Sequence, residues 1–126
     1  MTVIHRFKGN KNEPDWEGVD LHRYSAADLP GVKDVTRRIL IGPNEESDNF
    51  HIRYFEIQPG GNTPLDQHAH EHGVIILRGE GRVRLSDEEI TVNFGDALYI
   101  PGNEVHQFFC AGDAPFGFLC VVPAKR

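Results

Sequence analysis

The feature that most constrains this chain is a succession of short apolar or alternating segments that begins after Asp34. β-Branched and aromatic residues fill these segments, and none is long enough to form a buried helix. The pattern therefore predicts strands at residues 36–41, 50–57, 73–77, 83–85, 90–94, 97–100, 105–110 and 116–122. Short turn sequences that contain glycine or proline separate the segments, as in Gly42-Pro43 and Gly95-Asp96. Many short strands joined by such turns are typical of an antiparallel sandwich or barrel.

The first 35 residues differ from the rest, because they are polar and irregular, with one expected helical turn at residues 25–28. A chain of 126 residues holds a single ordinary core. We therefore expect an N-terminal arm at residues 1–35 that packs on the outside of one barrel at residues 36–126. A small barrel leaves edge strands that an arm or a second subunit covers, so a homodimer is expected.

Charge and apolar content narrow the classes of partner. The formal net charge of −6 gives the chain no overall attraction for phosphate backbones or anionic lipid, so neither nucleic acid nor a membrane is expected as a partner. The polar start has no signal-peptide hydrophobic region, and no apolar run approaches the length of a spanning helix, so we expect a cytoplasmic protein. Cys110 and Cys120 lie in apolar stretches and are expected to be reduced core thiols.

The strongest chemical signal is a cluster of three histidines, His68, His70 and His72, within five positions. Imidazole is the commonest side-chain ligand of transition metals, and residues two apart on a strand point to the same face. A pair such as Asp66 and His68 can therefore hold one ion. The alternative is an exposed histidine patch on a loop, since a short histidine-rich tract alone is only a compositional pointer to metal.

The flanking residues favour the metal interpretation. Gly60 is followed at fixed spacing by Asp66, His68, His72 and Gly79, in the pattern Gly-x5-Asp-x-His-x3-His-x6-Gly, and fifteen residues later comes Gly-x5-Pro-x4-His, from Gly95 to His106. These two segments resemble the two signature motifs of the cupin superfamily. The resemblance extends over roughly residues 50–122 and implies an all-β double-stranded β-helix, a small jelly-roll barrel. Gly60, Gly79 and Gly95 are expected in turns that require positive φ or a close approach of the backbone.

This sequence departs from the family pattern at two positions of the first motif. Asp66 stands where the family usually has its first histidine, and His72 stands where it usually has glutamate, so three histidines and one carboxylate are kept in permuted order. The resemblance thus implies Asp66, His68, His72 and His106 as metal ligands. Two alternatives stay open: His70 replaces Asp66, or Asp66 only forms a hydrogen bond to a ligand histidine.

Strand geometry adds one constraint on these ligands. Asp66 and His72 would lie nearly 20 Å apart on a flat strand at about 3.3 Å per residue, so the chain must bend between them. A bend after His68 places His72 at the start of the next strand and leaves His70 at the rim of the site. His70, Gln67 and Tyr99 are therefore candidates for the pocket.

Three imidazoles and one carboxylate leave a coordination position open, which is typical of a reactive metal site. One divalent transition metal per chain is expected, and Fe, Mn, Ni, Zn and Co all suit nitrogen and oxygen donors. We expect a metal-dependent enzyme that acts on a small oxygen-bearing molecule, with dioxygenase chemistry favoured over isomerase or lyase chemistry. The alternative is a non-catalytic module that binds or senses a small ligand at the same metal.

Overall fold

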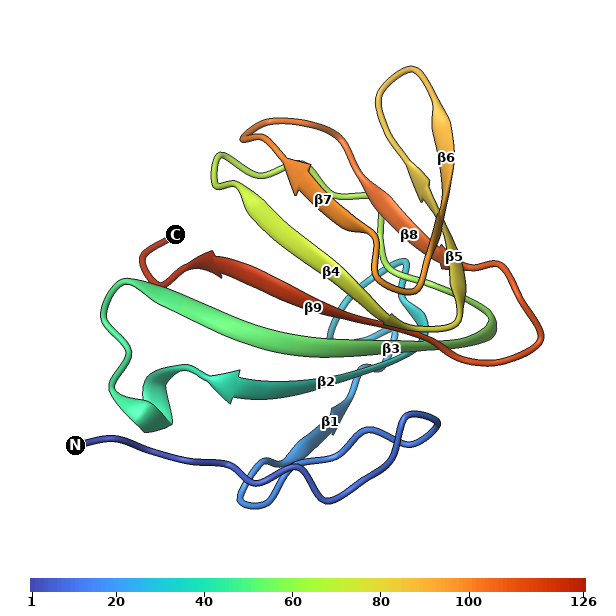
Figure 1. The fold of residues 1–126 in the computed structure, drawn as a ribbon. Helices are drawn as coiled ribbons and strands as arrows, with labels where there is room; N and C mark the ends of the chain where they lie inside the picture. The colour runs from blue at the N-terminus through green and yellow to red at the C-terminus, as the bar shows by residue number, and fades with distance from the viewer.

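The computed structural model describes all residues from Met1 to Arg126 and is built almost entirely of antiparallel strands (Figure 1). The one helical element is a short 3-10 turn, η1. No helix is long and apolar enough to cross a membrane. The elements are β1 (Leu21–Arg23), β2 (Lys33–Ile41), η1 (Pro43–Glu45), β3 (Phe50–Asn62), β4 (His72–Arg78), β5 (Glu80–Arg84), β6 (Glu89–Asn93), β7 (Ala97–Ile100), β8 (Gln107–Cys110) and β9 (Phe116–Pro123).

The strands form one strongly curled sheet. β1, β2, β3, β9, β4 and β7 lie side by side in that order, and β5 pairs with both β6 and β8. A single pairing, Asn62 with Phe109, connects β8 to β3 and closes the curl on that side. Figure 1 shows β5, β6 and β8 as a second group above the long curved layer. The predicted all-β jelly-roll barrel is confirmed.

The core follows from the alternation of side chains along each strand. On β9, Phe116, Phe118, Cys120 and Val122 point inward and are at most 4% exposed, whereas Val121 points outward and is 41% exposed. Both cysteines are buried and unpaired, as expected. Gly60, Gly79 and Gly95 all have positive φ, also as expected. At Gly79 a side chain would additionally collide with the backbone carbonyl of Pro115, so the turn between β4 and β5 needs glycine.

Every predicted strand is present, but the sequence missed some elements and boundaries. β1 has three exposed residues and no alternation, and it exists because it pairs with β2. η1 follows Gly42, whose backbone N–H donates to the Glu45 carboxylate at 2.7 Å. β3 continues through the Pro59-Gly60-Gly61 segment, where a turn was expected, because Asn62 pairs with Lys33 on one side and Phe109 on the other. The predicted turn at residues 25–28 forms, with the Leu29 N–H donating to the Ser25 carbonyl.

The N-terminal arm packs on the outer face of β3. Trp16 lies 5.4 Å, between ring centroids, from Tyr54, and this contact helps to leave Tyr54 without any exposed surface. The Asp15 carboxylate accepts a hydrogen bond from Arg38 on β2 at 3.2 Å. His5 and Glu45 form a further contact of 2.9 Å between the arm and η1. The arm is thus tied to the sheet at several separate points.

Candidate metal centre

Three strand ends bring the histidines together. His72 is the first residue of β4, His106 precedes β8, and His68 lies in the segment that joins β3 to β4. Asp66 and His106 form an isolated antiparallel bridge with two backbone hydrogen bonds of 2.9 Å each, which brings the two segments side by side. The chain bends at residues 69 and 70, as strand geometry requires, and so turns His72 back toward His68.

The imidazoles of His68, His72 and His106 form a compact group. One ring nitrogen of each lies within 4.8 Å of the others, and the ring centroids of His72 and His106 are 4.9 Å apart. His72 and His106 are buried, and His68 is partly exposed. A bond from imidazole to a transition metal is about 2.0–2.1 Å long, so small adjustments of the side chains would bring all three onto one ion.

Hydrogen bonds orient two of these rings for metal binding. The Nδ1–H of His106 donates to the carbonyl oxygen of Glu104 at 2.9 Å, which leaves the lone pair of Nε2 free. In His72, Nδ1 lies 3.3 Å from the Cys120 sulfur, and Nε2 is buried without any partner in the chain. A buried polar atom without a partner costs about 1–3 kcal/mol. The orphaned Nε2 of His72 therefore fits a site that accepts a metal ion.

The protonation state of His72 also suits a ligand. Burial, and to a lesser degree the charge of the nearby His106 imidazole, lower the pKa of His72 to about 3. The ring is consequently neutral at physiological pH, which is the form that binds a metal. Burial also raises the pKa of the Cys120 thiol, so the sulfur beside His72 carries its proton.

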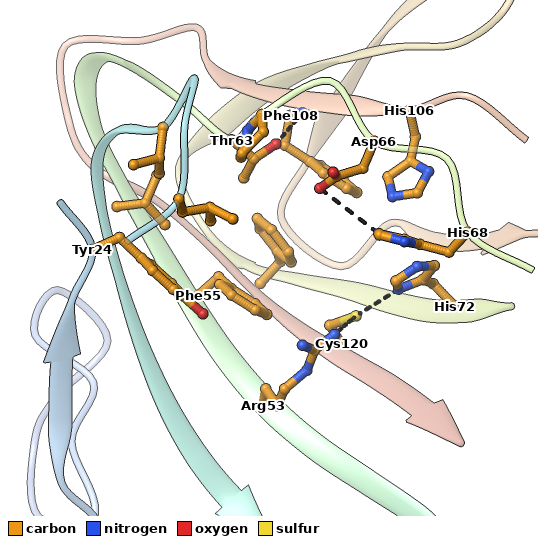
Figure 2. Close-up of a pocket in the computed structure, with 15 residues that line it drawn as sticks. Tyr24, Arg53, Phe55, Thr63, Asp66, His68, His72, His106, Phe108 and Cys120 are labelled. Atoms are coloured by element: carbon orange, nitrogen blue, oxygen red, sulfur yellow. Dashed lines mark hydrogen bonds and ion pairs between the residues drawn. The ribbon is translucent and has the colours of Figure 1, made fainter. Parts of the chain in front are cut away.

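Asp66 lies beside this group rather than within it. Its Oδ2 is 3.7 Å from Nε2 of His68, and the three-histidine group closes without it. The side chain nevertheless faces the same cavity (Figure 2). Two donors on one ion are separated by less than about twice a metal–ligand bond of 2.0–2.2 Å, so a spacing of 3.7 Å is compatible with Asp66 and His68 sharing an ion.

The other three candidates from the sequence lie outside the cavity lining. His70 stacks on His68 with 4.6 Å between ring centroids and also lies close to His72. Gln67 is exposed and donates to the Asn103 carbonyl at 2.9 Å, which ties the His68 segment to the loop before His106. Tyr99 is 67% exposed on the outer side of β7, where its hydroxyl contacts Glu71.

The histidines line a cavity of about 260 Å³. Figure 2 shows the imidazoles and Asp66 gathered at one end, with Tyr24 and Phe55 toward the other. The remaining lining is largely apolar and comes from both the barrel and the arm: Leu29, Val32, Val35, Arg53, Thr63, Pro64, Phe108, Phe118 and Cys120.

Sequence reasoning missed the contribution of the arm to this cavity. It placed the arm on the outside of the barrel, yet Tyr24, Leu29 and Val32 form part of the cavity wall. The only signal was the presence of these apolar residues in an otherwise polar segment. Cys120 was predicted as a core thiol, and its contact with His72 depends on the pairing of β9 with β4.

Known proteins resemble this chain in sequence. The sequence profile of the cupin domain matches residues 53–122. The 1-methylthio-D-xylulose 5-phosphate methylsulfurylase of Rhodospirillum rubrum is 38% identical over 120 residues, which are 95% of this chain and 76% of that protein.

Two solved structures superpose on nearly the whole of this chain. A cupin 2 conserved barrel domain protein from Rhodopseudomonas palustris superposes with a TM-score of 0.85 at 32% identity, covering 98% of this chain and 82% of that one. The polyketide cyclase RemF from Streptomyces resistomycificus superposes with a TM-score of 0.80 at 30% identity, covering 100% of this chain and 81% of that one.

Proposed function

Because this chain belongs to the cupin family, we propose that it is a metal-dependent enzyme that acts on a small oxygen-bearing molecule. The observation that carries the proposal is the group of three imidazoles at one end of an open, largely apolar cavity. A purely structural metal site closes its coordination sphere with protein ligands, whereas a reactive site leaves a position for substrate. The cavity beside the histidines provides room for that substrate.

We assign His68, His72 and His106 as the imidazole ligands and Asp66 as the carboxylate ligand on the side of His68. The carbonyl of Glu104 and the sulfur of Cys120 orient two of the rings. Such groups behind a metal ligand fix the tautomer and the direction of the lone pair. The set contains no thiolate and suits one divalent Fe, Mn, Ni, Zn or Co ion per chain.

The bound ion would supply a Lewis acid that polarises a carbonyl or hydroxyl oxygen of the substrate. The chain's own part is to exclude water and to hold the substrate against the open position. Tyr24 and Phe55 exclude water, since they cover the cavity from the side opposite the histidines, and Phe118 adds to the apolar lining. Water exclusion strengthens every electrostatic interaction inside the cavity.

Names of the relatives favour Lewis-acid chemistry over dioxygen activation. The Rhodospirillum rubrum protein is called a methylsulfurylase of a sugar phosphate, and the Streptomyces protein is called a polyketide cyclase. Neither name denotes a reaction with dioxygen. We therefore place this chain with enzymes that act on a small ketone or polyol, and we propose a phosphorylated sugar as the first substrate class to screen.

Metal analysis tests the proposal directly. The purified protein should contain close to one equivalent of a divalent transition metal, and His72→Ala and His106→Ala should lose it. His22→Ala is the matched control, because His22 is an exposed imidazole that packs edge-on against Tyr24 and belongs neither to the histidine cluster nor to the cavity lining. Equal metal contents in the wild-type protein and the His106→Ala variant would remove His106 from the ligand set.

We also propose that the chain forms a homodimer through the outer face of β4, β7 and β9. Ile75, Tyr99 and Val121 are 47%, 67% and 41% exposed, and they come from three adjacent strands. The arm covers only the neighbouring part of the same outer surface, around Tyr54. Val121→Asp should convert a dimer to a monomer in light scattering, whereas Phe94→Asp, at another exposed aromatic residue, should not. A wild-type protein that is monomeric at high concentration would contradict this assignment.

A further inference from the structure

Arg53 is a cation in the cavity with no anionic partner. It lies on the inward face of β3 and contributes to the lining of the cavity. Its Nη2 donates to the sulfur of Cys120 at 3.4 Å, and its guanidinium carbon lies 4.9 Å from the centroid of the Phe55 ring. Its Nε is buried and has no hydrogen-bonding partner.

These contacts leave most of the hydrogen-bonding capacity of Arg53 unused. A guanidinium carries five N–H donors and no acceptor, and a sulfur atom is only a weak acceptor. A partly buried charge is costly unless it is paired and hydrogen-bonded. Among the other half-buried arginines on neighbouring strands, Arg38 pairs with Asp15 and Arg78 pairs with Glu56, whereas Arg37 donates to the Tyr24 hydroxyl outside any ion pair. None of the ion pairs in the structure includes Arg53.

The surroundings of Arg53 are positive although the whole chain carries a net charge of −6. Asp66 is the single carboxylate that lines the cavity, and it lies at the histidine end. The C-terminal Arg126 is near enough to Arg53 that burial and the charge of Arg53 together lower the pKa of Arg126. An anion in the cavity would relieve this repulsion.

Arg53 lies close to the candidate metal centre, because it shares a contact with His72. Its Nη2 and the Nδ1 of His72 contact the same sulfur atom, that of Cys120, at 3.4 Å and 3.3 Å (Figure 2). A group bound to the free N–H donors of Arg53 is therefore close to the histidine cluster. Guanidinium recognises planar or tetrahedral oxyanions through parallel N–H···O bonds.

We propose that Arg53 is the anion-binding residue of this cavity, and that it holds the carboxylate or phosphate group of the small molecule whose other oxygen atoms reach the three histidines. The proposal rests on the proposed function in one respect, namely that the same cavity takes the substrate. It deepens that function by selecting anionic substrates over neutral sugars and ketones.

Calorimetric titration with two simple probes, inorganic phosphate and acetate at constant ionic strength, tests this assignment. Wild-type protein should bind at least one of them, and the probe that binds more tightly identifies the kind of anion. Arg53→Met should weaken that binding by roughly 10-fold or more, as expected for the loss of charge-assisted hydrogen bonds. Arg53→Lys should recover part of the affinity, because lysine keeps the charge but lacks the planar fork.

Arg82→Met is the matched control. Arg82 also lies over an aromatic ring, 4.8 Å from the centroid of Phe109, but it is paired with Glu89 and does not line the cavity. This variant should bind the probe like the wild type. Metal content is measured on every sample, so that an anion held by the metal alone is recognised: Arg53→Met with normal metal content and normal anion affinity would overturn the proposal. So would a wild-type protein that binds neither probe.

A measurement on wild-type protein covers the case in which Arg53→Met does not fold. Phenylglyoxal modifies accessible guanidinium groups, and mass spectrometry locates the modified residues. Phosphate or acetate should slow the modification of Arg53 and leave that of Arg82 unchanged, and equal protection or no protection at the two sites would reject the assignment. A wild-type protein without metal would count against the proposed function alone, because protection of Arg53 is observed independently of the metal.

Discussion

The buried imidazole of His72 should make the metal-free protein sensitive to acid. The pKa of His72 is about 3 in the folded chain, chiefly because the ring is buried, whereas an exposed histidine titrates near 6.5. Between these two values the unfolded chain binds a proton that the folded chain does not. Stability therefore falls as the pH drops below about 6.5, by about 1.4 kcal/mol per pH unit, and the loss reaches about 2 kcal/mol at about pH 5.

His72→Leu removes this titrating group and nearly preserves the volume of the side chain. It also removes the orphaned Nε2, whose burial costs about 1–3 kcal/mol, at the expense of the contact between Nδ1 and Cys120. At about pH 7.5 the metal-free variant should thus be at least as stable as the metal-free wild type. At about pH 5 its advantage should grow by about 2 kcal/mol.

Urea unfolding after treatment with a chelator measures both quantities. The informative number is the change in unfolding free energy between about pH 7.5 and about pH 5, compared between the two proteins, because other titrating groups contribute equally to both. Adding a divalent ion at a hundred times its dissociation constant should stabilise the wild type by about 2.7 kcal/mol and the variant far less. If both metal-free proteins lose the same stability over this pH interval, His72 is not buried in the neutral form and the argument fails.

Further expectations concern Asp66 and the arm. Asp66→Ala should weaken metal binding by about 10- to 100-fold in competition with a chromophoric chelator, and Asp66→His should retain metal binding. Equal metal affinities for Asp66→Ala and the wild type would show that only the histidines are ligands. In the arm, the hydrogen bond between His5 and Glu45 raises the pKa of His5. Burial tends to raise the pKa of Glu45, but the hydrogen bonds from His5 and from the Gly42 N–H outweigh burial and lower that pKa. Arm protection in hydrogen exchange should therefore be greatest between about pH 4.5 and about pH 6.5, declining above this interval as His5 loses its proton and below it as Glu45 gains one, and a profile unchanged by Glu45→Gln would contradict the pairing. Trp16→Ala should lower the free energy of unfolding by about 2–4 kcal/mol because it uncovers Tyr54, and an unchanged urea midpoint would show that the arm adds no stability.

The strands could be predicted from the sequence because alternation and turn residues are local signals. β4 and β9 show this well: both carry buried side chains on every second position, and both were expected within one residue of their observed ends. β1 could not be predicted, because its three residues are exposed and its stability comes from pairing with β2. Elements that depend on a partner strand rather than on their own pattern leave no such signal.

The candidate site was predictable to the level of its histidines and no further. The resemblance to the two cupin motifs, together with the bend required between Asp66 and His72, implied that His68, His72 and His106 converge, as they do in the structure. The relation of Asp66 to them depends on the bridge between Asp66 and His106, which is a long-range pairing. The direction of the Arg53 side chain depends on which face of β3 points inward, and a shift of one residue in register reverses that face.

The two faces of β3 explain why the arm belongs to the functional part of the molecule. On the inward face Arg53 and Phe55 line the cavity, and on the outward face Tyr54 receives Trp16 of the arm. The same arm then supplies Leu29 and other apolar residues to the cavity wall. Release of the arm would open that wall to water and weaken the electrostatic interactions that the cavity depends on. β3 thus connects the packing that fixes the arm to the lining of the cavity, and the polar N-terminal segment both packs on the outer face of the sheet and forms part of the cavity wall.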